Sequence, residues 1–442
     1  METRASPSPP FRLGIRANLG QFVVQTVLVF FVGITVGLER NVVPVLAKEE
    51  FAIVSTSVIL SFVVSFGFVK ALLNLLGGRL SESWGRRPVL VLGWVVAVPI
   101  PLMIIWAPNW WWIVGANILM GINQGLAWSM TVTSKMDLVG TKWRGFAIGV
   151  NEFAGYSGVA TGALVTGYIA ASYGLRPAPF YFGLAIILAA LGIALGLARE
   201  TRGLAHSEAA LGQDALSGGQ PGEAIEPCSR SPGLWNIFRL TSWQDRAMLS
   251  ASQAGLLHKF ADALVWVAFP LFFASRGLGV GKIGLIIGVY GFTWGVFQLG
   301  TGPLTDKVGR KWPIVLGLLL CAVGVWATPA VEGVGPWLGT AALTGLGMAL
   351  LYPTLLAVIG DVSNPCWRGA SLGVYRMWRD SGYAFGALAI GAISDRLGLS
   401  YGFYFTALVL LLSAAIVALT MYETAPARRQ RVPRWQEDPL YT

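Results

Sequence analysis

The sequence has few of the residues on which metalloproteins, disulfide-rich proteins and most enzymes depend. Charged residues make up 12% of its 442 positions, and there are only two histidines and three cysteines. Cys228, Cys321 and Cys366 lie far apart and lack the spacing of a zinc site or a CxxC pair, so neither a metal site nor a disulfide framework is predicted. A phosphate-binding glycine loop and a nucleophile constellation are also missing, which argues against an enzyme and against ATP-driven transport.

Apolar residues dominate what remains. They make up 55% of the chain, and the mean hydropathy is +0.62. This is more apolar side chain than the core of one water-soluble protein could bury. The apolar runs are continuous and about 20 residues long, which predicts membrane-spanning helices instead of alternating strands. We therefore expect an all-α membrane protein with twelve spans, near residues 19–45, 54–76, 88–106, 111–134, 145–171, 178–197, 247–274, 283–301, 313–330, 336–359, 369–393 and 401–421.

Basic residues follow the predicted topology. The net charge of +10 could suggest a nucleic-acid partner, but the positions of the 32 Lys and Arg residues argue against one. If both termini are cytoplasmic, 22 of the 32 lie in cytoplasmic segments, five in outer loops and five inside spans. This asymmetry is typical of a multi-pass protein with both termini in the cytoplasm. The bilayer, and not nucleic acid, is the expected partner.

One long hydrophilic stretch divides the chain. Residues 199–246 are rich in Gly, Ala, Ser and Glu in their middle, which predicts a disordered cytoplasmic linker that acts as a tether. The predicted organisation is a cytoplasmic segment over residues 1–18, a six-helix bundle over 19–198, the linker, a second six-helix bundle over 247–422 and a cytoplasmic tail over 423–442. The amino-terminal segment is polar and lacks the features of a signal peptide.

An internal repeat relates the two halves at a constant offset of 224 residues. The loop after the second span, GGRLSESWGRRPVLVLG from Gly77, matches TGPLTDKVGRKWPIVLG from Thr301 after the eighth span. The entry to the fifth span, DLVGTKWRGFAIGV from Asp137, matches DVSNPCWRGASLGV from Asp361. Two separate blocks at one offset indicate a duplicated six-helix unit, with the copies related by a pseudo-two-fold axis along the membrane normal.

These loops resemble the cytoplasmic signature of the major facilitator superfamily, Gly-x-x-x-Asp-(Arg/Lys)-x-Gly-(Arg/Lys)-(Arg/Lys). The first copy departs from it at Glu82 and Ser83 but keeps Gly78, Gly85, Arg86 and Arg87. The sequence Arg-Glu-Thr, which ends the sixth span, adds to the resemblance, which covers essentially the whole chain. It implies a monomeric transporter of a small molecule that needs no cofactor beyond a proton gradient. The second copy fits fully, with Gly302, Asp306, Lys307, Gly309, Arg310 and Lys311.

The acidic and basic residues of these loops can exchange partners when the two halves rock. For Glu82 and Asp306 the resemblance implies gating, in which they stabilise the outward-open state. The alternative is that the charges only hold the topology, and for Arg87 and Lys311 the two interpretations stand equal.

Ionisable residues inside the spans are the best indicators of function, because their burial in lipid is costly. Glu39 and Glu152 are candidate proton carriers, with Asp262 as a third. Helical spacing allows Asp262 to pair with His258 and Lys259, and Asp380 to pair with Arg376. Arg40 must find its partner on another helix. The alternative role for these pairs is to hold helices together.

The same spans supply a candidate substrate cavity. Lys70 and Arg379 lack an evident acid nearby, and the small excess of positive charge favours an anionic or zwitterionic substrate. The resemblance implies that the first, fourth, seventh and tenth spans line the cavity, with aromatic residues of the eighth contributing. The candidate cavity residues are Arg40, Asn41, Lys70, Asn123, Gln124, His258, Tyr290, Trp294, Tyr352, Arg376, Arg379 and Asp380.

These observations predict a secondary active transporter that exports a small solute by alternating access and is coupled to protons. Efflux pumps of the resembled family carry an Arg in the fourth span where Gly121 stands here, and a Gly-Pro signature in the fifth span that is degenerate here. An anion or organic-acid uptake carrier and a non-transporting membrane sensor remain alternatives. Short loops and the absence of glycosylation sequons fit a bacterial inner membrane.

Overall fold

The computed structural model describes residues 14–139, 144–204, 233–363 and 367–425. Within them there is no strand, and the first half of the chain folds into six long helical segments. The predicted all-α fold class is thereby confirmed. These segments are α1 (Leu19–Glu49), α2 (Thr56–Trp84), α3 with α4 (Arg86–Ala97, Pro99–Ile105), α5 with η1 and α6 (Trp110–Asn123, Gln124–Trp128, Ser129–Val139), α7 (Arg144–Tyr173) and α8 (Ala178–Gly196).

The second half repeats this arrangement. Nine of the twelve described segments are long and apolar enough to cross a membrane by themselves. The other three, α5 to α6, α7 and α16, carry many of the polar residues discussed below. The second-half segments are α11 with η4 and α12 (Arg246–Ala263, Leu264–Ala268, Phe269–Ser275), α13 (Val280–Val308), α14 with η5 (Lys311–Ala327, Thr328–Ala330), α15 (Val334–Val362), α16 (Arg368–Leu397) and α17 (Leu399–Thr420).

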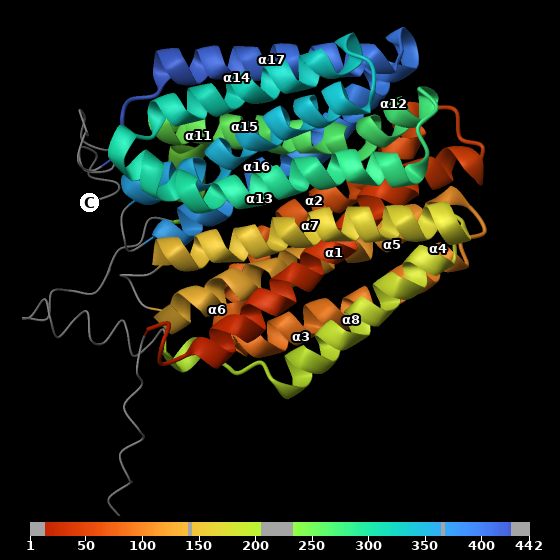
Figure 1. Cartoon of the computed structure of the whole chain (residues 1–442). Coiled ribbons are helices and arrows are strands. Elements are labelled where there is room, and N and C mark those ends of the chain that lie inside the picture. Colours follow the sequence, from red (N-terminus) through yellow and green to blue (C-terminus); the bar gives the residue numbers. More distant parts are fainter. Residues whose placement is uncertain (1–13, 140–143, 205–232, 364–366, 426–442) are drawn as a thin grey trace, which may run out of the picture.

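The two halves form two bundles that meet along two helix pairs. Figure 1 shows the first half, red to yellow-green, below the second half, green to blue. At the junction α7 packs along α13, and α2 packs along α16. Side chains on these four helices can therefore reach a space shared by both halves.

Large apolar side chains face outward on the peripheral helices. Leu188 of α8, Leu316 of α14 and Leu412 of α17 are each half exposed, and Leu419 is 86% exposed. A water-soluble protein would bury residues of this kind, whereas lipid is an apolar solvent for them. The chain is an integral multi-pass membrane protein.

Small residues let α1 and α7 approach closely. An added Cβ at Gly33 would lie 2.0 Å from the carbonyl oxygen of Gly155, and one at Gly158 would lie 2.1 Å from that of Phe30. Such separations leave no room for a side chain, as in other membrane helix pairs that pack through small residues. This contact fixes the position of α7, which carries Glu152.

Local breaks in the helices fall next to polar residues. The π-helical turn η1 interrupts the fourth span at Gln124–Trp128, and η4 interrupts the seventh at Leu264–Ala268. A π turn rotates the side chains that follow it and is frequent at functional sites. Gln124 and Trp128 both face the central pocket described below.

The predicted linker over residues 199–246 is folded at its described carboxyl end. Helix α10 (Leu234–Arg239) and the turn η3 (Leu240–Gln244) precede α11, and Ile237 and Leu240 are buried. The prediction of a disordered tether is therefore wrong for this part, because its apolar residues pack on the second bundle. The middle of the linker, residues 205–232, lies outside the described residues, as does most of the predicted tail.

Candidate functional site

A pocket lies between the two bundles. Six spans line it. Five of the lining residues are basic or acidic: one each comes from α1, α2 and α7 of the first half, and two come from α16 of the second half. The lining residues are Val36, Arg40, Phe66, Lys70, Asn74, Gln124, Trp128, Ser129, Glu152, Tyr156, Val159, Tyr352, Arg376, Arg379 and Tyr383.

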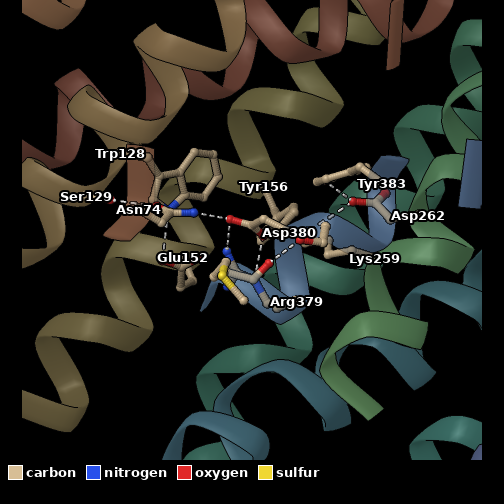
Figure 2. A network of polar contacts seen from close by, with 12 residues as sticks. Asn74, Trp128, Ser129, Glu152, Tyr156, Lys259, Asp262, Arg379, Asp380 and Tyr383 are labelled. Carbon is tan, nitrogen blue, oxygen red and sulfur yellow. Dashed lines mark hydrogen bonds and ion pairs between the residues drawn. The ribbon is translucent and has the colours of Figure 1, made fainter. Parts of the chain in front are cut away.

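Asp262 of α11 forms the first charged network at this pocket. Its carboxylate accepts two hydrogen bonds from Arg40 of α1, at 2.5 and 2.9 Å, and one from Lys259 at 3.0 Å. The hydroxyls of Tyr290 and Tyr383 donate to the same carboxylate at 2.9 and 2.6 Å. Figure 2 shows Asp262 between Lys259 and Tyr383. One buried acid thus forms ion pairs with two buried cations, and its pair with Arg40 connects the two halves of the protein.

The predicted partners of Asp262 are confirmed in part. Arg40 does find its partner on another helix, and Lys259 pairs with Asp262 within α11. The pairing with His258 is wrong. The carboxylate is turned toward Arg40, and the His258 ring packs 5.1 Å from the ring of Trp294.

Asp380 of α16 forms the second network. Arg379 donates to its carboxylate from Nε at 2.7 Å and from a terminal nitrogen at 3.0 Å. The side-chain amide of Asn74 on α2 also donates to it, and Ser129 donates to Asn74 at 3.2 Å (Figure 2). The predicted pairing of Asp380 with Arg376 is wrong, and so is the prediction that Arg379 lacks an acid, because its long guanidinium side chain folds back onto the neighbouring residue.

Two cations at the pocket have no acid within ion-pair distance among the described residues. Lys70 makes no ion pair or hydrogen bond with the part of the chain that the structure describes, and its ammonium lies 5.4 to 5.7 Å from the ring centres of Phe66, Trp128 and Tyr383. Arg376 likewise has no ion pair or hydrogen bond among the described residues, and its Nε is buried. The prediction that Lys70 lacks a local acid is confirmed.

The two candidate proton carriers of the first half lie in different places. Glu152 lines the central pocket, where its Oε1 accepts hydrogen bonds from Trp128 at 3.0 Å and Asn151 at 3.2 Å. Glu39 is 1% exposed and lines a second pocket inside the first bundle, enclosed by α1, α4, α5 and α8 together with α3. Although it is adjacent to Arg40, it faces away from the central pocket, because successive helical residues point about 100° apart.

Several predicted cavity residues hold helices together instead of lining the central pocket. Asn41 donates to the carbonyl oxygen of Ala163 on α7, and Asn123 donates to that of Gly93 on α3. Trp294 stacks on Tyr156 with ring centres 3.6 Å apart. The predicted residues that do line the pocket are Arg40, Lys70, Gln124, Glu152, Tyr352, Arg376 and Arg379.

Four aromatic residues of the pocket were missed by sequence reasoning. They are Phe66, Trp128, Tyr156 and Tyr383. Each lies four positions from a residue that was predicted, namely Lys70, Gln124, Glu152 and Arg379. Residues four apart share a face of a helix, so this spacing was the available signal.

The duplicated loops after the second and eighth spans fold into matching structures. Gly85 and Gly309 have φ angles of +98° and +99°, a conformation that glycine adopts without strain. The backbone nitrogen of Arg86 donates to Glu200 at 2.9 Å, and that of Arg310 donates to Glu423 at 2.8 Å. Each arginine also reaches an acid of the neighbouring repeat block, Arg86 to Asp137 and Arg310 to Asp361, both at 3.1 Å.

Glu423 is a loop residue that the sequence analysis did not identify. Its signal is the Glu-Thr pair at 423–424, which repeats the Glu-Thr pair at 200–201.

Partial burial opposes ionisation of Glu200, but the backbone N–H groups of four residues, Arg86 among them, lower the pKa of this carboxyl below its usual 4.5. The ionised Glu200 therefore stabilises the folded protein fully above pH 4.5, and this stabilisation is lost as the pH falls through the lower pKa of the folded state.

The remaining predicted gating residues differ in their surroundings. Asp306 pairs with Arg310 at 2.6 Å while 65% exposed, and Lys307 is exposed. Lys311 donates from its backbone to Glu423 at 3.3 Å, and Arg87 does the same to Glu200 at 3.0 Å. The described structure holds no atom within 4 Å of a Cβ added at Gly302. Gly78 and Glu82 lie within α2, and the side chain of Glu82 falls outside what the structure describes.

We expect Gly309→Ala to destabilise the second loop. The substitution forces an L-residue to φ +99° and places its Cβ 2.4 Å from Oε2 of Glu423, so a loss of about 1–3 kcal/mol is expected. Thermal unfolding of the purified variant measures it. Gly300→Ala, in the helix that Gly309 caps and with no atom within 4 Å of its Cβ, is the control. Equal stability of the two variants would contradict the role of Gly309.

Comparisons with known proteins agree with this geometry. The family model of the Major Facilitator Superfamily matches residues 26–258 and 251–440. An uncharacterised MFS-type transporter of Salmonella typhimurium is 24% identical over 406 residues, which cover 88% of this chain and 93% of that protein. Multidrug resistance protein MdtG of Enterobacter lignolyticus is 23% identical over 371 residues, which cover 83% of this chain and 82% of that protein.

A solved structure shares the fold. The xylose transporter XylE from E. coli, in a partially occluded inward open conformation, superposes with a TM-score of 0.71 at 16% identity, covering 92% of this chain and 98% of that one. The family model spans both bundles, and the duplicated loops carry its signature. The chain belongs to the Major Facilitator Superfamily of membrane transporters.

Proposed function

We propose that the protein is a secondary active transporter that works by alternating access, is coupled to protons and exports its substrate. The central pocket between the bundles carries this proposal, because charged side chains from both halves line it. Rocking of the halves about such a pocket would expose it to one side of the membrane at a time. The duplicated loops, with both termini, would face the cytoplasm of a cell whose inner membrane holds the protein.

The end of the pocket remote from these loops is closed by contacts between the halves. Arg40 binds Asp262, and Asp395 of α16 accepts hydrogen bonds from Ser55 at 2.8 Å and from the backbone of Ser57 at 3.1 Å. In the proposed topology this is the outer end. Opening toward the outside would require these contacts to break.

Export is the proposed direction of transport. Several relatives carry the name multidrug resistance protein MdtG. The Arg of the efflux signature is absent, and packing explains why: a Cβ added at Gly121 would lie 2.9 Å from the carbonyl oxygen of Phe66, so a long side chain does not fit there. The second candidate, uptake of an organic anion, is favoured by the two cations that lack an acid. A non-transporting sensor would show no flux in the experiments below.

Glu152 is the proposed proton carrier at the pocket. One carboxylate oxygen accepts two hydrogen bonds, and Oε2 has no partner among the described residues, so a proton can be taken up there. We expect Glu152→Gln to abolish substrate-driven proton movement in proteoliposomes, measured with a pH-sensitive dye during a screen of candidate solutes. Glu332→Gln, an outer-loop residue that is 82% exposed, is the control.

Glu39 provides a comparison within the same assay. Glu39 lies in the second pocket, away from the proposed substrate site. Any effect of Glu39→Gln should therefore be on proton coupling, with substrate affinity unchanged. Glu152→Gln should change both. Proton movement that persists in Glu152→Gln would remove this residue from the coupling mechanism.

A further inference from the structure

We infer that the substrate is an organic anion with an aromatic or similarly flat apolar body, bound through Lys70 of the first half and Arg376 of the second. This inference rests on the proposed transport function and adds the chemical class of the ligand.

The charge balance of the pocket is the first observation. Asp262 is shared by Arg40 and Lys259, and Asp380 is bound by Arg379, so these two acids are fully occupied by cations of the protein. Lys70 and Arg376 line the same pocket and have no acid within ion-pair distance in the described chain. A buried cation without a counter-charge is costly, and an anion that enters the pocket would remove that cost.

The surroundings of Lys70 keep it available to a ligand. Three aromatic faces, those of Phe66, Trp128 and Tyr383, surround its ammonium. Cation–π contacts stabilise a positive charge without occupying its hydrogen-bond donors. All three donors of Lys70 therefore remain free for carboxylate or sulfonate oxygens. The guanidinium of Arg376 can bind the same kind of group in bidentate fashion.

The walls of the pocket suit an apolar body. Phe66, Trp128, Tyr156, Tyr352 and Tyr383 all line it. Their rings bury large apolar area and favour offset or edge-on contacts with a second ring. A cationic ligand is disfavoured, because Glu152 is the one acid among the described lining residues, and two protein groups already donate to one of its oxygens. When Glu152 carries a proton it also ceases to repel an anion.

A set of ligands with one ring and different charges tests the inference. Binding of benzoate, benzenesulfonate, benzamide and benzylamine to the purified full chain is measured by calorimetry. We expect the two anions to bind at least about tenfold more tightly than the neutral and cationic compounds. Lys70→Met and Arg376→Met should each weaken anion binding about 10- to 100-fold.

Matched variants separate charge from damage to the fold. Lys70→Arg and Arg376→Lys keep the positive charge and should retain most of the binding, and Lys282→Met, an exposed cation outside the pocket, should bind like the original protein. No binding by either anion, tighter binding of benzamide or benzylamine, or anion binding unchanged in both Met variants would overturn the inference.

Flux measurements distinguish failure of this inference from failure of the proposed function. If proteoliposomes transport a neutral or cationic solute while the anions do not bind, transport stands and the anion assignment falls. If the anions bind through Lys70 and Arg376 but no compound crosses the membrane under any pH gradient, the site stands and the transport proposal falls.

Discussion

Asp262→Asn is expected to abolish transport and to lower the stability of the protein by about 3–5 kcal/mol. The substitution removes the acid that Arg40 and Lys259 share and leaves two buried cations beside each other without compensation. It also weakens the hydrogen bonds from Tyr290 and Tyr383, which depend on the carboxylate. Thermal unfolding in detergent and flux in proteoliposomes measure the two effects.

Asp395→Asn is the matched control for this prediction. Asp395 also joins the two halves, but its described partners are hydroxyl and backbone groups of Ser55, Thr56 and Ser57, with no cation among them. Its amide can keep one acceptor, so a loss of about 1 kcal/mol is expected. If the two variants lose equal stability, the stability depends on contact between the halves and not on the pairing of the buried charges, which would contradict the prediction.

Gly37→Val is expected to prevent correct assembly of the first bundle. A Cβ at this position would lie 2.1 Å from the carbonyl oxygen of Val159, which belongs to the backbone of α7 and cannot move aside alone. Overpacking of this kind costs about 3 kcal/mol or more, because the whole helix must shift. The yield of monodisperse protein and its unfolding temperature report the effect.

Gly20→Val serves as the comparison, since it lies on the same helix with no atom within 4 Å of its Cβ. Valine has the same modest helix propensity at both positions. A Gly37→Val protein that folds as well as Gly20→Val would show that α1 and α7 can separate without harm.

Much of the fold could be predicted from the sequence because its signals are local. Continuous apolar runs mark the helices, and the repeated Gly-Arg pairs at 85–86 and 309–310 mark the duplication. The folded loops bear out that repeat to the level of individual hydrogen bonds. The short helix α10 was missed because its apolar residues are too few to form a recognisable span.

The site was predictable in its members but not in its pairings. Lys70, Glu152 and Arg376 were identified because ionisable residues in apolar runs stand out. Which acid binds which cation depends on rotamers and on distances between helices, and helical spacing alone assigned Asp380 to Arg376 instead of to its neighbour Arg379. Glu39 was predicted as a proton carrier from its depth in the membrane, but the direction of its side chain, into the second pocket, was not predictable.

In the proposed rocking motion, the length of α2 would give the pocket and the loop after this helix different amplitudes of motion. Lys70 and Arg86 are separated by 16 positions, most of them within α2, or about 24 Å at 1.5 Å per residue. If α2 tilts about 10° around a fulcrum at Lys70, the loop end moves about 4 Å while the ammonium hardly moves. In the proposed cycle α2 would therefore act as a lever. A small rearrangement at a bound ligand would become a larger displacement where the backbone of Arg86 meets Glu200, and breaking that contact would in turn shift Lys70 relative to the ligand.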